Sequence, residues 1–85
     1  MNLNEILRKR KTIYGYRNVK KKMLKGDIDF VIIAKSCPTQ IKRDILNLCD
    51  VFNIKHEEFD GTTMELGTAC GRPHSISVLG VLKEW

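Results

Sequence analysis

The segment from Glu65 to His74 carries the residue types and spacings that best suit binding chemistry in this chain. Gly67 and Gly71 are four residues apart, so within one helix they would share a face and leave a strip of bare backbone. Glycine inside a helix costs about 0.5–1 kcal/mol relative to alanine, so two of them need a reason, and one candidate is a ligand that can approach this bare backbone closely. A carboxylate and an imidazole flank the strip and can hydrogen-bond such a ligand.

Metal binding and catalysis are weaker interpretations of the same residues. Cys70 and His74 form a single loose pair with Pro73 between them, whereas structural zinc sites have paired ligands at both ends. The three cysteines (Cys37, Cys49 and Cys70) form no CxxC pair and are odd in number, which favours free, mostly buried thiols over a disulfide framework. There is no GxxxxGK[ST] loop and no GxGxxG turn, and the acidic residues are scattered. The sequence therefore predicts no metal, no cofactor and no enzyme activity.

The charge of the chain is concentrated at one end. The first 25 residues hold nine lysines or arginines and one acidic residue, whereas the other 60 residues hold six basic and nine acidic residues. Such a one-sided field is typical of a surface that binds a polyanion. The alternative is a basic face that is merely solvated.

The length of 85 residues predicts one domain that spans residues 1–85. No apolar run approaches the roughly 18 residues that a membrane span requires, so we expect no membrane partner. The first residues lack the basic and apolar regions of a secretory signal. We therefore expect a cytoplasmic protein.

A helix is predicted directly after Gly15 and should end at Gly26. Its buried side would carry Tyr16, Val19 and Met23, which are spaced three and four residues apart. Arg17, Lys20 and Lys21 fall in its first turns, where free backbone N–H groups can also meet a phosphate. This helix start is a second candidate contact for a nucleic acid.

The remaining elements alternate between helix and strand. A short helix capped by Asn2 precedes a strand at 12–14, and the apolar run at 29–34 predicts a central strand covered on both faces. The next helix has Pro38 in its first turn, Ser36 or Cys37 as its cap, and an apolar stripe that ends before Asn53. Further strands are expected at 56–59 and 76–82. This order predicts an α/β fold, a three-layer α/β/α sandwich.

Another helix, which carries both glycines, should begin at Thr62. Thr62 and Glu65 match a capping box, in which each side chain bonds the backbone N–H of the other residue. Glu65 can serve only as this cap, or it can also accept hydrogen bonds from guanine. Leu66 is either a core residue or a cover for an extruded nucleotide, and His74 either stacks on a base or is simply exposed.

The residues quoted above resemble a known family. Gly15-Tyr16-Arg17 at a helix start, the apolar strand and the block Glu65-Leu66-Gly67-Thr68-Ala69-Cys70-Gly71-Arg72-Pro73-His74 are similar to the kink-turn RNA-binding ribosomal proteins, of the archaeal and eukaryotic large-subunit type. The resemblance covers nearly all of the chain. It implies a four-stranded mixed sheet between helices, with one end of the sandwich gripping a kinked internal loop that contains sheared G·A pairs.

The resemblance also implies which residues bind RNA. They come from three segments: Gly15, Arg17, Asn18 and Lys21; Lys35 and Ser36; and Glu65, Leu66, Gly67, Thr68 and His74. The implied partners are ribosomal RNA and neighbouring proteins of the large subunit, with the chain bound as a monomer on a cytoplasmic ribosome. Relatives in guide-RNA modification particles usually have Asn-Glu where this chain has Arg17-Asn18. That difference favours a structural ribosomal role over the alternative, a subunit of a guide-RNA modification ribonucleoprotein.

Overall fold

The structure is a computed structural model and describes residues 3–83. Helices and strands alternate in the predicted order: α1 (Leu3–Lys9), β1 (Thr12–Tyr14), α2 (Tyr16–Lys25), β2 (Ile28–Ala34), α3 (Thr39–Val51), β3 (Lys55–Phe59), α4 (Thr63–Ala69) and β4 (Val78–Leu82). Among the described residues, no helix has the length and apolar character needed to cross a membrane. The predicted cap Asn2 lies outside the described residues.

The strands form one mixed sheet in the order β1-β4-β2-β3. The central strand β2 pairs in parallel with β3 and antiparallel with β4, and β4 also pairs antiparallel with β1. Strands β1, β2 and β3 therefore run in one direction and β4 runs in the other. A four-stranded mixed sheet was the predicted arrangement, and it is confirmed.

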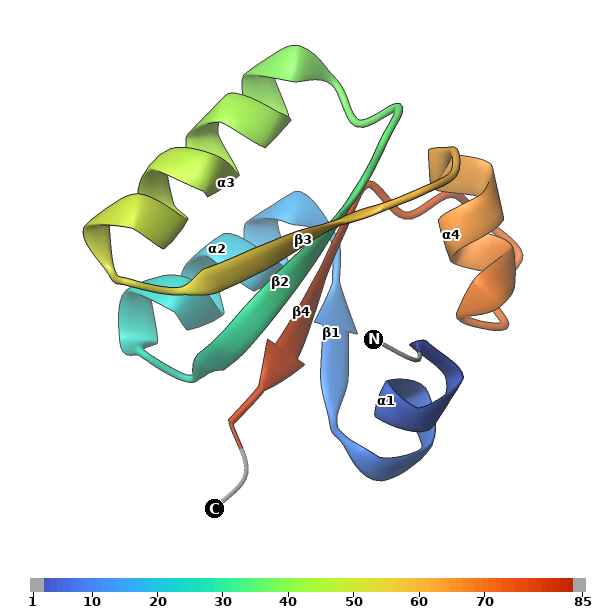
Figure 1. Cartoon of the computed structure of the whole chain (residues 1–85), viewed down its shortest axis with the longest axis horizontal. Coiled ribbons are helices and arrows are strands. Elements are labelled where there is room, and N and C mark those ends of the chain that lie inside the picture. Colours follow the sequence, from blue (N-terminus) through green and yellow to red (C-terminus); the bar gives the residue numbers. More distant parts are fainter. Residues whose placement is uncertain (1–2, 84–85) are drawn as a thin grey trace.

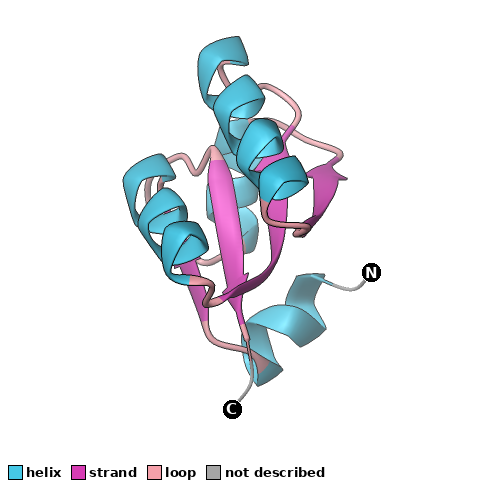
Figure 2. Ribbon diagram, turned by 90° about the vertical axis from the view of Figure 1, so that its left-hand side faces the viewer, coloured by secondary structure: helices cyan, strands magenta, loops and turns pink. Residues whose placement is uncertain are grey.

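Helices cover both faces of this sheet, as Figures 1 and 2 show. On one face, α2 and α3 pack on Val31 and Ile33 of β2, with Val19 and Ile45 in the same buried cluster. On the other face, Leu66 of α4 packs in a second cluster whose members include Ile32, Ala34, Ile76 and Leu79. Successive residues of a strand point to opposite faces, so β2 supplies both cores. The predicted three-layer α/β/α sandwich is confirmed.

The boundaries of α2 and α3 follow local backbone chemistry. Helix α2 starts after Gly15 and ends at Gly26, whose φ of 77° is left-handed, so both ends lie where they were predicted. The cap predicted for α3 is wrong. Pro38 is the N-cap residue with an extended backbone (ψ 138°) and no side-chain hydrogen bond. Ser36 instead accepts a hydrogen bond from the N–H of Thr63, 3.0 Å away.

The glycine-bearing helix is shorter than the sequence predicted. Helix α4 ends at Ala69, so Gly71 lies beyond it and the predicted strip with two glycines on one helical face does not exist. Gly71 has a φ of 72°, a left-handed conformation that glycine adopts without strain. Its N–H donates to the carbonyl of Thr68, which ends the helix. Gly71 is thus a helix terminator.

Candidate nucleic-acid interface

The directions of the strands bring the predicted binding segments to one end of the sheet. Tyr14 of β1 and Val78 of β4 lie at that end, and so do Ala34 of β2 and Phe59 of β3, because Ala34 pairs with Phe59. We call this end, with residues 15–18, 35–36, 60–65 and 72–77, the loop end. Residues from all three predicted segments lie there, although they are up to about 60 positions apart in sequence.

Backbone and side-chain hydrogen bonds fix these segments to one another. The donor and acceptor pairs are Gly15 N–H to Val78 O (3.1 Å), Lys35 N–H to Gly61 O (3.0 Å), Thr63 N–H to Ser36 Oγ (3.0 Å) and Ile76 N–H to Thr63 O (2.9 Å). Each bond joins segments that leave different strands. The loop end is therefore a single connected surface, which is the form that a preorganised binding site requires.

The start of α2 presents two cations and a free helix N-terminus. Gly15 is the N-cap residue with a φ of 96° and no side-chain cap, so the first backbone N–H groups are available to an anion. Asn18 donates from Nδ2 to the carbonyl of Tyr14, 3.3 Å away, which ties the helix to the end of β1. Arg17 and Lys21 are exposed and four residues apart, so they share one face of α2.

Lys20, the third cation of these turns, is turned toward α3 instead. Its Nζ lies 3.3 Å from both the hydroxyl oxygen of Tyr16 and Oδ2 of Asp44. The hydroxyl of Tyr16 also donates to Asp44. The hydrogen bonds that Lys20 donates, first to Tyr16 and then to Asp44, raise the pKa of Lys20. The hydrogen bond that Tyr16 donates to Asp44 is the main cause that lowers the pKa of Asp44. This cluster joins α2 to α3, so Lys20 helps to hold the helix in place.

Asp44→Asn is expected to lower the thermal stability of the protein at pH 7 and to have little effect in acid. A carboxyl whose pKa is lowered by folding stabilises the fold above its unfolded pKa of about 3.9, and that contribution is lost as the pH falls through the folded value. Thermal melts of wild type and variant at pH 7 should therefore differ, and the gap should begin to close below about pH 4 and disappear once the pH is below the lowered folded pKa of Asp44. A gap that persisted in acid would show that the charge of Asp44 is not the stabilising feature.

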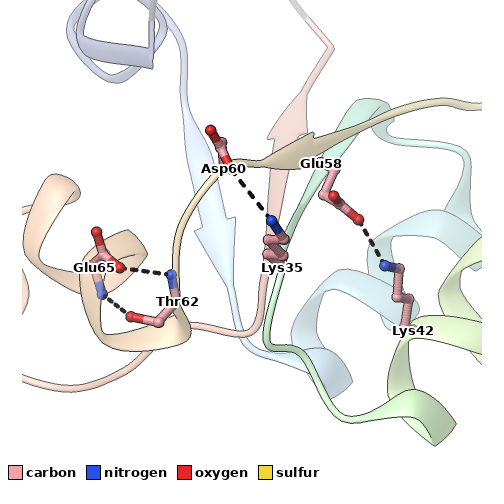
Figure 3. Close-up of polar contacts among 6 residues, drawn as sticks. All are labelled: Lys35, Lys42, Glu58, Asp60, Thr62 and Glu65. Carbon is pink, nitrogen blue, oxygen red and sulfur yellow. Dashed lines mark hydrogen bonds and ion pairs between the residues drawn. The ribbon is translucent and has the colours of Figure 1, made fainter.

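Lys35 and Ser36 follow β2 and lie next to the start of α4. Lys35 is 68% exposed, and its Nζ is 3.9 Å from a carboxylate oxygen of Asp60, which is 99% exposed (Figure 3). An ion pair this exposed contributes at most about 1 kcal/mol, so a phosphate can compete for Lys35. Sequence reasoning did not identify Asp60 as the ion-pair partner of Lys35, because only the pairing of β2 with β3 places the two residues side by side.

Glu65 completes the predicted capping box, which is confirmed (Figure 3). The N–H of Glu65 donates to the hydroxyl of Thr62, and Oε1 of Glu65 accepts from the N–H of Thr62, both at 3.1 Å. The side chain remains exposed. Capping therefore fixes the direction of the carboxylate at the loop end while its second oxygen can accept a hydrogen bond from a ligand.

Leu66 and Gly67 lie inside the fold rather than on its surface. Leu66 is fully buried in the core cluster of the α4 face, so its side chain belongs to the core and does not cover a nucleotide. A Cβ on Gly67 would lie 2.0 Å from the carbonyl oxygen of His74, so the protein's own chain occupies the space that the sequence assigned to a ligand. RNA contact at these two positions stays a prediction, and both residues are buried in the structure.

The other two residues of this segment are exposed. The hydroxyl of Thr68 donates to the carbonyl of Met64, 3.0 Å away, on the outer side of α4. His74 lies against Tyr14, with 5.5 Å between the ring centroids and a tilt of 43°. Tyr14 was not among the predicted site residues, because a tyrosine in a short strand is ordinarily a sheet residue. Its position directly before Gly15 was the only signal for it.

The described residues offer little support for metal or thiol chemistry. Between residues 3 and 83, no group of three or more His, Cys, Asp or Glu side chains is placed to hold a metal ion. All three thiols are free, and burial raises the pKa of Cys37, Cys49 and Cys70. Thiols with raised pKa values stay protonated at neutral pH and are poor nucleophiles.

The same fold occurs in solved structures. A protein of unknown function from Bacillus halodurans C aligns with a TM-score of 0.82 and 26% identity over 93% of this chain and 78% of its own. The Giardia lamblia 15.5kD RNA binding protein aligns with a TM-score of 0.80 over 95% of this chain and 67% of its own. Its identity is 21%, so this likeness establishes the fold alone.

Curated relatives share more of the sequence. Large ribosomal subunit protein eL30 of Sulfurisphaera tokodaii is 36% identical over 94% of this chain and 76% of its own length. The protein of the same name from Tetrahymena thermophila is 34% identical over 91% of this chain and 74% of its own length. A profile of the family described as Ribosomal protein L7Ae/L30e/S12e/Gadd45 matches residues 2–84. The chain therefore belongs to the ribosomal protein L7Ae/L30e/S12e/Gadd45 family.

Proposed function

We propose that this chain is a non-enzymatic structural constituent of the large ribosomal subunit that binds a kink-turn in ribosomal RNA through its loop end. Its relatives are named large ribosomal subunit proteins, and they match most of its length. The observation that carries the proposal is that segments from β1, β2, β3 and β4 meet at one hydrogen-bonded end. The chain acts in the cytoplasm on the ribosome, as a monomer beside other large-subunit proteins.

The contacts divide into those that position RNA and those that read it. Arg17, Lys21 and Lys35 are exposed cations that suit backbone phosphates, which fix the placement of RNA without reading its sequence. Glu65 suits the N–H donors of an unpaired guanine, and His74 suits stacking on an exposed base. A kink-turn offers both in one place, because its sharp bend exposes bases next to closely spaced phosphates.

The alternative function is that of a kink-turn-binding subunit in a guide-RNA modification ribonucleoprotein. The names of the curated relatives do not favour it. Affinity purification of the tagged chain from cells separates the two functions. Ribosomal RNA and large-subunit proteins in the eluate support the ribosomal assignment, whereas small guide RNAs with a modification enzyme would contradict it.

Arg17→Ala is expected to weaken binding to all RNAs alike, by about tenfold, because it removes a charged phosphate contact. The logarithm of the binding constant should also depend less on the logarithm of salt concentration, with a slope smaller by about one. Filter binding at several salt concentrations measures both quantities.

Lys20→Ala is the matched control, since it removes the same charge one turn away. Lys20 is already held by Tyr16 and Asp44, so its loss should leave the salt slope nearly unchanged. Equal effects of the two substitutions would show that only the overall charge of α2 matters.

A further inference from the structure

The ring of Tyr14 holds two side chains from the segment that follows α4. Cζ of Arg72 lies 4.8 Å from the centroid of the ring, and the His74 ring lies 5.5 Å from it. Tyr14 is the last residue of β1 and is half-buried against the α4-side core, so its ring has a fixed position. Arg72 and His74 are both exposed. The ring is thus a support that presents a guanidinium and an imidazole to solvent at the loop end.

The backbone around Arg72 is fixed as well. Its N–H donates to the carbonyl of Gly67, 2.9 Å away, and the left-handed Gly71 turns the chain directly before it. Because Gly67 has no side chain, the carbonyl of His74 passes next to α4. Arg72 is therefore anchored through its backbone and by the aromatic face under its guanidinium. Such anchoring lowers the entropy that is lost when the side chain binds a ligand.

Arg72 differs from Lys35 and Lys20 in its electrostatic surroundings. Lys35 lies beside Asp60, and Lys20 beside Asp44. In the part of the chain that the structure describes, no carboxylate lies within ion-pair distance of Arg72. A guanidinium on an aromatic ring keeps its five N–H donors at its edge, where they match a phosphate geometrically.

We propose that Arg72 binds a backbone phosphate of the RNA and that Tyr14 is the residue that positions it. This inference rests on the proposed function, since it adds a contact to the same interface. With Arg72, the loop end has cations on both sides of the sheet: Arg17 lies on the α2 side and Arg72 on the α4 side. The RNA would then be held from both faces of the sheet at this end.

Four variants test the two roles by salt-dependent binding to a kink-turn RNA. Arg72→Gln keeps the length of the side chain and should weaken binding about tenfold, with a salt slope smaller by about one. Tyr14→Leu removes the ring and should weaken binding about threefold, whereas Tyr14→Phe keeps the ring and should bind like wild type. The double variant that carries both Arg72→Gln and Tyr14→Leu should bind the RNA nearly as well as Arg72→Gln alone, because Tyr14 acts mainly through Arg72.

Wild-type affinity and salt slope in Arg72→Gln would overturn the role of Arg72. Equal losses in Tyr14→Leu and Tyr14→Phe, or no loss in either, would overturn the role of Tyr14. Arg72 is exposed, so its variant tests the phosphate contact even if Tyr14→Leu destabilises the fold. A phosphate contact contributes to the binding of duplex RNA as well. If the wild type shows no preference for kink-turns, the same four variants measured on a duplex still test the roles of Arg72 and Tyr14.

Discussion

Gly67→Val is expected to destabilise the fold of the protein rather than only the proposed RNA interface. A Cβ at this position would lie 2.0 Å from the carbonyl oxygen and 3.0 Å from the carbonyl carbon of His74. These are backbone atoms of a segment that is hydrogen-bonded to α4 and β2, so they cannot move aside as a flexible side chain would. We expect the free energy of unfolding to fall by about 3 kcal/mol or more, the upper end for overpacked sites. Urea denaturation measures this loss.

Gly71 supplies the matched control for Gly67. It is the other glycine of the same segment, but nothing lies within 4 Å of the position that its Cβ would take. Its φ of 72° is tolerated by asparagine, so Gly71→Asn should cost only about 1 kcal/mol. Wild-type stability in Gly67→Ala would contradict the close approach of His74 to α4.

Glu65→Gln is expected to weaken binding to a kink-turn RNA by about 10- to 100-fold without lowering protein stability. Glutamine can still accept the hydrogen bond from the N–H of Thr62, so the capping box survives. What is lost is the carboxylate, which we propose accepts two N–H groups of a guanine, and a bidentate contact of this kind is worth about 1–3 kcal/mol. Gel-shift titration with the kink-turn RNA measures the loss, and thermal melts check the fold.

Thr62→Ala is the complementary variant, because it weakens the cap and leaves the carboxylate of Glu65 in place. It removes the hydroxyl that accepts the N–H of Glu65 while keeping the carboxylate, and it should cost about 1 kcal/mol of stability. Its effect on RNA affinity should be much smaller than that of Glu65→Gln. If Thr62→Ala weakened RNA binding as strongly as Glu65→Gln did, Glu65 would act through the cap alone.

The sequence predicted the secondary structure where local chemistry decides it. Gly15 and Gly26 bound α2 because each adopts a positive φ, and Thr62 with Glu65 starts α4 because the two residues cap each other. The apolar run of β2 predicted a strand covered on both faces, and its alternating side chains do enter two separate cores. Each of these signals lies within a few residues of the feature that it predicts.

The features that were missed depend on contacts between distant residues. Gly67 is required by a carbonyl seven positions later in the chain, so its neighbours in sequence do not distinguish a packed glycine from one open to a ligand. Ser36 bonds Thr63 in preference to capping α3, and this follows from the parallel pairing of β2 with β3. Tyr14 and Arg72 meet only because β1 lies on the side of the sheet nearest the segment after α4. Tertiary topology supplied these contacts.

The preference of the wild-type protein for a kinked RNA tests the proposed function most directly. The measurement is a gel-shift series with a kink-turn RNA, the same RNA with its sheared G·A pairs disrupted, and a straight duplex, at several salt concentrations. We expect tight binding to the kink-turn alone, and affinity for all three RNAs should fall as salt rises, since phosphate contacts release counterions. Equal affinity for the three RNAs would contradict kink-turn recognition by the loop end.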